Sequence, residues 1–127
     1  MKIEYQREVD MNKIVELKEK AKIGWASFIS FEALTSTAAP KLVEFANVKE
    51  GMKLLDVACG TGVVALTASR AGAHVEGVDL TPELISRANE NSKIMGLEAN
   101  FIEGDAEFLP YDDRKIDVVV SQYGHMF

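Results

Sequence analysis

The strongest constraint on the fold is an apolar run that breaks into a small-residue loop and then resumes as a helix, LLDVACGTGVVAL at residues 54–66. Three further short apolar runs follow it, and helical stretches at 63–71 and 82–95 separate the first three runs. Strands that alternate with helices predict βαβ units and a parallel sheet. Because such crossovers are right-handed, we expect an α/β Rossmann-like three-layer sandwich. Its strands are predicted near 53–58, 74–79, 99–103 and 116–121.

Two helices are predicted before the first strand. Over residues 10–24, the apolar side chains fall on one stripe and the charged ones on the other face. The stripe consists of Ile14, Leu17, Ala21 and Trp25, and the outward face of Lys13, Glu16, Lys18 and Lys20. The segment TSTAAPKLVEFANV begins with capping residues and predicts a second helix over 37–46. For the helix at 82–95, Thr81 is the expected cap, Pro82 lies in the first turn and Gly96 marks the end.

Length and composition limit the classes of protein. A chain of 127 residues suits one domain, which we divide into N-terminal helices with a possible lid at 1–46 and a βαβ core at 47–127. A net charge of −6 argues against a nucleic-acid partner, and no apolar run approaches membrane-spanning length, so no membrane partner is expected. The single cysteine, Cys59, suits the reducing cytoplasm. Two histidines and one cysteine at these separations predict no metal site.

The glycine loop predicts a nucleoside site. Ligands of parallel α/β sheets bind at the carboxyl ends of the strands. There, Gly60 and Gly62 leave room for a close backbone approach, and the following helix directs free N–H groups toward the loop. Asp79 ends the second strand, 17 residues after Gly62, where a carboxylate can accept hydrogen bonds from ribose hydroxyls.

Two nucleoside ligands are compatible with this loop. The stretch GTGVVA matches the G-x-G-x-x-A fingerprint of NAD-binding domains, so an NAD(P)-binding Rossmann domain is one alternative. Asp56, just before the loop, would repel a pyrophosphate but could bind an ammonium group. Asp105, in EGDAEFLP after the third strand, could accept a hydrogen bond from an adenine amine. Three acids in these places favour S-adenosylmethionine, which is cationic and has no phosphate.

Four segments in this order resemble the class I S-adenosylmethionine-dependent methyltransferases, from about residue 35 to the C-terminus. They are LLDVACGTGVVAL, VEGVDLTPELISRA, EGDAEFLP and the run through IDVVVSQYGHMF, and they are most similar to the small-molecule enzymes related to ubiquinone and menaquinone biosynthesis. The resemblance implies a methyl transfer to a small-molecule acceptor, with S-adenosylhomocysteine as product. The cofactor-binding positions that it implies are Asp56, Ala58, Gly60, Thr61, Gly62, Asp79, Leu80, Asp105, Ala106 and Ser121. Ala58 replaces the family's first loop glycine, which a negative φ would allow.

Several of these residues also have a plainer interpretation. Asp79 could cap the next turn, Asp56 could bind loop amides, and Asp105 could belong to a turn. His125 is a weak candidate for a catalytic base, and the catalytic residue is otherwise unknown. Trp25 and Phe28 are expected to pack a helix against the domain, with a lid role for residues 23–34 as the alternative.

The last predicted strand lies close to the end of the sequence. The resemblance implies further strands, but only QYGHMF follows IDVVVS, so we expect a chain truncated after the fourth strand. An apolar strand suited to a sheet interior would then lie at an edge with unpaired backbone groups. We therefore expect a homo-oligomer, such as a dimer, through residues 116–121, or a partner that supplies the missing half. A non-catalytic module that binds S-adenosylmethionine or S-adenosylhomocysteine is a further alternative.

Overall fold

The computed structural model describes residues 10–126, apart from the side chain of His125. One parallel sheet has the strand order β3-β2-β1-β4. The elements are, in chain order, α1 (Met11–Ala26), η1 (Ser27–Phe31), α2 (Glu32–Thr35), α3 (Ala39–Phe45), β1 (Lys53–Val57), α4 (Val63–Arg70), β2 (His74–Asp79), α5 (Pro82–Met95), β3 (Asn100–Glu103), β4 (Val118–Val120) and η2 (Gly124–Met126).

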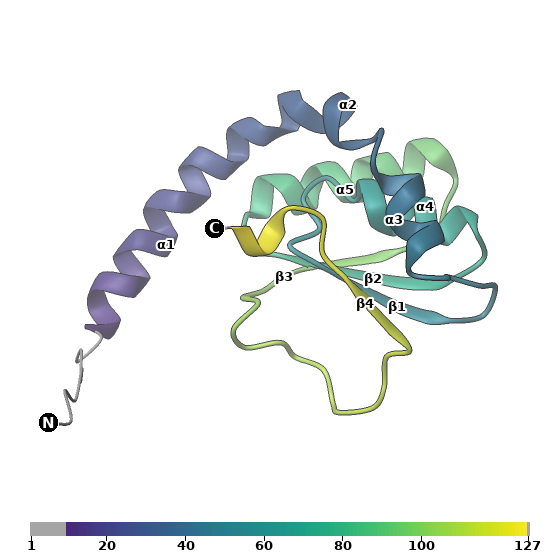
Figure 1. Ribbon diagram of the computed structural model, residues 1–127. Coiled ribbons are helices and arrows are strands. Elements are labelled where there is room, and N and C mark those ends of the chain that lie inside the picture. Colours follow the sequence, from purple (N-terminus) through teal and green to yellow (C-terminus); the bar gives the residue numbers. More distant parts are fainter. Residues whose placement is uncertain (1–9, 127) are drawn as a thin grey trace, which may run out of the picture.

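The predicted α/β fold and its parallel sheet are confirmed. Helices α3, α4 and α5 lie on one side of the sheet, and the long segment between β3 and β4 passes along the other side (Figure 1). The main core lies between the sheet and these helices and includes Leu54, Val75 and Phe101. Because successive strand residues point to opposite faces, Leu55 and Val78 face the other side, where they are also buried.

Helix α1 presents the predicted stripe to the domain at Ile14, Ala21 and Trp25, which are half-buried, but it departs from the prediction at Leu17 and Lys18. Its N-cap is Asp10, whose carboxylate accepts the N–H groups of the first turn. Leu17, which was predicted to face inward, is 57% exposed. Lys18, which was predicted to face outward, contacts acids that follow β3, and Lys22 contacts Glu103 at the end of that strand. The outward prediction for Lys18 is therefore wrong, because its ammonium group pairs with Asp105 and Glu107 and its side chain is only 27% exposed.

The predicted helix boundaries need two corrections. The helix expected over 37–46 begins at Ala39, and no side chain caps it among the described residues; Ala38 occupies the N-cap position. Thr81 is the N-cap of α5 as predicted, but its hydroxyl makes no capping bond. Gly96 ends α5 in the left-handed conformation that the sequence indicated. Over residues 10–126, none of the helices has the length and apolar character that crossing a bilayer requires.

Candidate functional site

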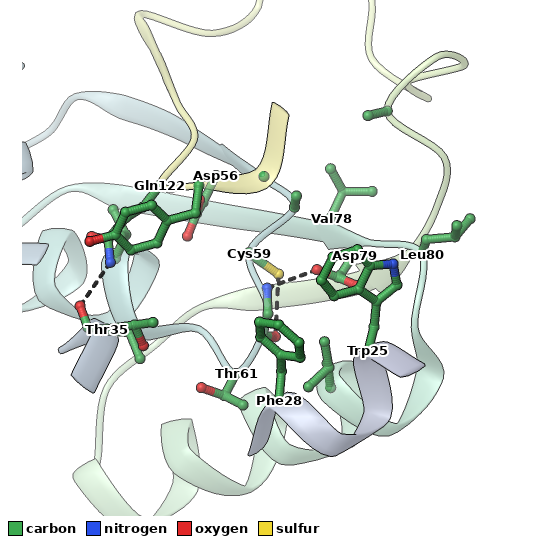
Figure 2. A pocket seen from close by; sticks show the side chains of 18 of the residues that line it. Trp25, Phe28, Thr35, Asp56, Cys59, Thr61, Val78, Asp79, Leu80 and Gln122 are labelled. Atoms are coloured by element: carbon green, nitrogen blue, oxygen red, sulfur yellow. Dashed lines mark hydrogen bonds between the residues drawn. The ribbon is translucent and has the colours of Figure 1, made fainter. Parts of the chain in front are cut away.

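A cavity of about 500 Å³ lies at the carboxyl edge of the sheet. Its walls come from four parts of the chain: the α1–α2 segment, the loop after β1, the ends of β2 and β3, and residues 122–126. Figure 2 shows side chains from these parts converging on the same space. Most of the predicted cofactor-binding residues line it, namely Asp56, Ala58, Gly60, Thr61, Asp79, Leu80, Asp105 and Ala106.

The loop after β1 is a tight turn with left-handed residues. Ala58, Gly60 and Gly62 have φ values of 56°, 55° and 84°. The negative φ expected for Ala58 is therefore wrong, and the loop takes on a strain of about 1–2 kcal/mol at that residue. The loop is fixed by a hydrogen bond from the N–H of Cys59 to the carbonyl of Val78, at 3.0 Å. This bond joins the ends of two neighbouring strands and so places the loop at the carboxyl edge.

Gly62 has a packing role that the sequence did not reveal. It is not among the residues that line the cavity. A Cβ atom on Gly62 would lie 2.7 Å from Cζ of Phe101 and 3.2 Å from Cβ of Ala88. Glycine is required there both by the positive φ and by the close approach of the Phe101 ring.

Asp56 is the most deeply buried acid of the site. Only 1% of it is exposed, and its Oδ2 atom accepts a hydrogen bond from the N–H of Ala65, at 3.1 Å. Burial raises the pKa of Asp56 to about 7, and the nearby charge of Asp79 adds to the increase. The carboxyl therefore binds the first turn of α4 and also lines the cavity. This position is compatible with both predicted roles, the binding of backbone amides and the binding of a ligand's ammonium group.

Asp79 accepts hydrogen bonds from the glycine loop and from the N-cap of α5. Its Oδ2 accepts a hydrogen bond from the N–H of Gly60, at 2.9 Å, and its Oδ1 accepts one from the N–H of Thr81, also at 2.9 Å. A carboxylate has about four acceptor positions, so each oxygen keeps capacity for one more donor from the cavity. Leu80, the next residue, provides an apolar surface beside it.

Asp105 is paired with a lysine from the N-terminal helix. The Nζ atom of Lys18 lies 2.5 Å from Oδ2 of Asp105 and also contacts Glu107. The N–H of Glu107 donates to Oδ1 of Asp105, at 3.0 Å. The hydrogen bond from Lys18, followed by that from the Glu107 backbone, lowers the pKa of Asp105, so the carboxylate is ionised at neutral pH. Ala106 follows it on the cavity wall.

Two other predicted positions have different outcomes. Ser121 follows β4 and is half-buried, but it is not among the residues that line the cavity. It lies next to Gly124, which does line the cavity. A Cβ atom added to Gly124 would lie 2.7 Å from Oγ of Ser121. His125 belongs to η2, and its side chain lies outside the described part of the chain, so its catalytic role stays a prediction.

The N-terminal segment contributes cavity residues that the sequence did not assign to the site. The rings of Trp25 and Phe28 line the cavity, with their centroids 4.9 Å apart in an edge-to-face arrangement. Glu32 and Thr35 from α2 line it as well, and so does Gln122, which follows β4. The Nε2 atom of Gln122 donates to the carbonyl of Thr35, at 2.8 Å (Figure 2). The aromatic pair and Glu32 lie within residues 23–34, which were considered as a lid, whereas Thr35 and Gln122 had no sequence signal.

The charges around the cavity are mainly negative. Four carboxylates and one ammonium group line it, from Glu32, Asp56, Asp79, Asp105 and Lys18. The thiol of Cys59 also faces this region, but burial raises its pKa, so it is an unreactive thiol. Among the side chains of residues 10–126 other than His125, no three from His, Cys, Asp or Glu form a group that could bind a metal ion. This arrangement suits a cationic organic ligand.

Comparison with known protein families gives one direct assignment. The model of a methyltransferase domain matches residues 54–127, which is more than half of the chain. The chain belongs to this methyltransferase domain family. The matched residues contain the glycine loop and the acids at the ends of β1, β2 and β3.

Curated relatives share the same part of the chain. An uncharacterized protein of Mycobacterium tuberculosis, Rv1403c, is 43% identical over 96 residues, which are 76% of this chain and 35% of the relative. A demethylmenaquinone methyltransferase of Thermus thermophilus is 36% identical over 86 residues, 66% of this chain and 39% of that enzyme. The chain thus spans little more than a third of the length of these relatives.

Solved structures support the fold. A methyltransferase from Thiobacillus denitrificans, solved in complex with S-adenosyl-L-homocysteine, has a TM-score of 0.59 at 26% identity, over 67% of this chain and 35% of that chain. A Methanococcus maripaludis protein described as a putative S-adenosyl-L-methionine-dependent methyltransferase has a TM-score of 0.67 over 87% of this chain and 52% of its own. Its identity of 18% supports the fold alone.

Proposed function

We propose that this chain binds S-adenosylmethionine and is the cofactor-binding part of a methyltransferase that acts on a small-molecule acceptor. The observation that supports this most is the convergence of Asp56, Asp79 and Asp105, from the ends of three strands, on one cavity. Similarity to a structure solved with S-adenosyl-L-homocysteine gives independent support. An NAD(P) site is disfavoured, because the acidic side chains that line the cavity outnumber its single lysine and would repel a pyrophosphate.

Each acid has a distinct role in this proposal. Asp56 would bind the ammonium group of the cofactor, Asp79 would accept from the ribose hydroxyls with its remaining acceptor positions, and Asp105 would accept from the adenine amine. When bound, S-adenosylmethionine supplies a methyl group that is already activated by its sulfonium. The chain therefore has to position the cofactor and exclude water, and the rings of Trp25 and Phe28 provide an apolar wall for this purpose.

A binding measurement tests the proposal. We expect calorimetry to detect binding of S-adenosylmethionine and S-adenosylhomocysteine but not of NAD. Asp79→Ala should weaken both affinities by about tenfold or more, since a charged acceptor is lost. Asp117→Ala is the matched control, because Asp117 also accepts a backbone N–H, from Lys53 at 2.8 Å, but at the opposite edge of the sheet. Unchanged affinity in Asp79→Ala would remove Asp79 from the site.

Binding without turnover is the second candidate. Among the described side chains that line the cavity there is no histidine, and the lysine is paired with two acids. Transfer of an isotope-labelled methyl group to a pool of small acceptors separates the two functions, because a binding module would take up the cofactor without releasing labelled product.

We also propose that β4 is an association edge, either for a second copy of this chain or for a polypeptide that completes the sheet. This strand lies at one end of the described sheet, and Val119 at its centre is 60% exposed. Exposed apolar edges of this kind are templates for strand pairing. A single monomeric mass by light scattering at high concentration would count against the homo-oligomer. We further infer a cytoplasmic location from the one buried cysteine, Cys59.

A further inference from the structure

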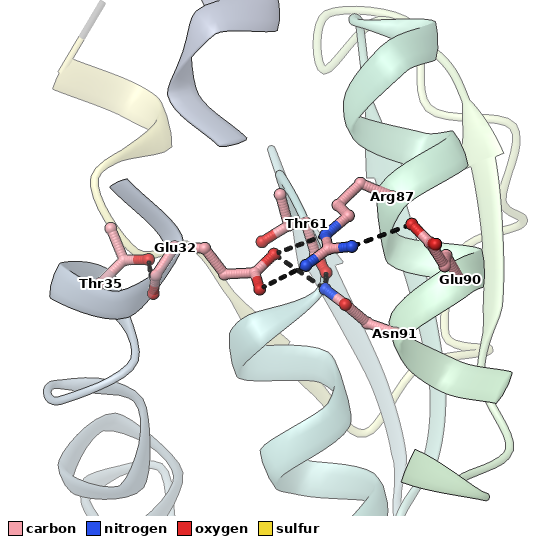
Figure 3. Close-up of polar contacts among 6 residues, drawn as sticks. All are labelled: Glu32, Thr35, Thr61, Arg87, Glu90 and Asn91. Atoms are coloured by element: carbon pink, nitrogen blue, oxygen red, sulfur yellow. Dashed lines mark hydrogen bonds and ion pairs between the residues drawn. The ribbon is translucent and has the colours of Figure 1, made fainter. Parts of the chain in front are cut away.

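A polar cluster beside the cavity has no part in the roles assigned above. Its centre is Glu32, a half-buried residue of α2 that lines the cavity (Figure 3). The Oε2 atom of Glu32 accepts a hydrogen bond from Nδ2 of Asn91, at 2.9 Å. Two guanidinium nitrogens of Arg87 lie 3.4 Å from the two carboxylate oxygens. Both partners belong to α5, so the cluster joins α2 to that helix.

The cluster continues into the glycine loop. The same Nδ2 group of Asn91 donates to the carbonyl of Thr61, at 3.1 Å. Asn91 is 5% exposed and Thr61 is 6% exposed, so this contact is shielded from water. A hydrogen bond in such surroundings is stronger than one at the surface, and an unsatisfied group there is costly. One buried amide therefore connects Glu32 to the backbone of the loop that lines the cavity.

The charge of Glu32 is maintained by its partners. Burial acts to raise the pKa of Glu32, but hydrogen bonds from Asn91 and Thr61, together with the Arg87 guanidinium, lower it overall. The carboxylate is therefore ionised at neutral pH. An ionised, partly buried carboxylate binds its donors about twice as strongly as a neutral acceptor does.

A second contact fixes the other end of α2. The carbonyl of Thr35 accepts the hydrogen bond from Gln122, which follows β4 and lies beside Thr35 on the cavity wall. Helix α2 is thus attached to α5 by Glu32 and to the end of β4 by Thr35. Trp25 and Phe28 lie in the helical segment that leads directly into α2. The position of this aromatic wall therefore depends on where α2 is anchored.

We propose that Glu32 is a positioning residue of the cofactor site, which holds the glycine loop and the aromatic wall of Trp25 and Phe28 in one binding arrangement. This inference depends on the function proposed above. Glu32 acts through Asn91 and Thr61 on the loop, and through α2 on the aromatic rings. The cofactor therefore meets a preorganised site, and the loss of this carboxylate requires part of the binding energy to order the loop and α2.

Three variants test this role. Glu32→Ala removes all the contacts, whereas Glu32→Gln keeps an acceptor oxygen for Asn91 but loses the charge opposite Arg87. Glu90→Gln is the matched control, because Glu90 also binds Arg87, at 2.9 Å from Nη1, but is exposed and does not line the cavity. Affinities for S-adenosylmethionine and S-adenosylhomocysteine are measured by calorimetry. The emission of Trp25, the single tryptophan, reports on the aromatic wall when the ligand is added.

The expected results differ between the variants. Glu32→Ala should bind both ligands about tenfold or more weakly and lose most of the Trp25 response, because a charge-assisted contact is removed. Glu32→Gln should recover part of both, and Glu90→Gln should match the wild type. A role in stability alone would lower the melting temperature of Glu32→Ala but leave the affinity and the Trp25 response unchanged, and that result would overturn the inference.

Two further outcomes have a defined meaning. If Glu32→Ala does not fold, as judged by circular dichroism, Glu32→Gln decides, and an affinity equal to that of the wild type would overturn the inference. If the wild-type chain binds neither S-adenosylmethionine nor S-adenosylhomocysteine, the proposed function fails first and this inference fails with it. Normal wild-type binding with unchanged Glu32 variants refutes only the positioning role.

Discussion

Asp56→Asn is expected to remove a pH dependence of stability that the buried carboxyl creates. The ordinary pKa of an aspartate is 3.8, and burial raises that of Asp56 to about 7 in the folded chain. Between these two values the unfolded chain has lost the proton while the folded chain retains it. The free energy of unfolding should therefore fall as the pH rises from about 4 to about 7, by about 4 kcal/mol in total. The stabilisation is complete below the lower value and absent above the higher one.

The asparagine variant is a suitable reference because its amide oxygen can still accept the hydrogen bond from Ala65. Other acids behave in the opposite way: Glu32 and Asp105 have lowered pKa values, so they stabilise the fold above pH 4 and lose this effect on acidification. The informative quantity is therefore the difference between the wild type and Asp56→Asn. Urea unfolding at several pH values, followed by circular dichroism, measures it. Equal slopes against pH in both proteins would refute the reasoning.

The same carboxyl predicts how ligand affinity depends on pH. A cationic ligand beside Asp56 favours the ionised form, so binding below pH 7 must release the proton. The affinity for S-adenosylmethionine should then rise by up to about tenfold per pH unit between about pH 5.5 and 7 and become constant above it. Asp56→Asn should bind more weakly and lack this contribution. Calorimetry at several pH values is the measurement, and an equal pH dependence in the two proteins would show that Asp56 does not bind the cation.

Two further substitutions have expected outcomes. Lys18→Ala removes the ion pairs to Asp105 and Glu107. It should increase the dissociation rate of the cofactor and make that rate less dependent on salt concentration, as measured by stopped-flow fluorescence. Lys20→Ala is its control, because Lys20 pairs only within α1 among the described contacts, and an equal effect of both variants would show that the Lys18 ion pairs do not slow release of the cofactor. Gly77→Ala should lower the free energy of unfolding by about 1–3 kcal/mol, because its Cβ would lie 2.6 Å from the ring of Phe101. Gly24→Ala, whose Cβ would have open space, should not destabilise the chain in the same urea experiment, and equal losses would contradict the packing argument.

The features that were predicted correctly depend on residues close together in the sequence. The alternation of apolar runs with helical stretches determines βαβ units, whose parallel strands are joined by right-handed crossovers. The glycine loop and Asp79 are placed by the same rule, since parallel strands end at one edge of the sheet. Local periodicity and chain direction were therefore sufficient for this half of the cavity.

The features that were missed depend on contacts between distant residues. Lys18 and Asp105 are separated by 87 positions, and Glu32 and Asn91 by 59. The hydrophobic pattern of α1 favoured an inward Leu17, because a pattern cannot register that acids at the end of β3 lie where that helix docks. The left-handed Ala58 was missed as well, and the residue after it donates its N–H to Val78 in the neighbouring strand, 19 positions away.

The polar contacts of the N-terminal segment explain why its aromatic residues belong to the site. A helix that packed only through Trp25 and Phe28 could slide on an apolar surface, because dispersion contacts have little directional preference. Ion pairs at Lys18 and hydrogen bonds at Glu32 attach the segment to the domain before and after the two rings, and both residues line the cavity. The rings between them are then held over the cavity. The residues that determine this wall are therefore the charged ones at its ends, and substitutions there should change ligand binding more than conservative exchanges of the rings themselves.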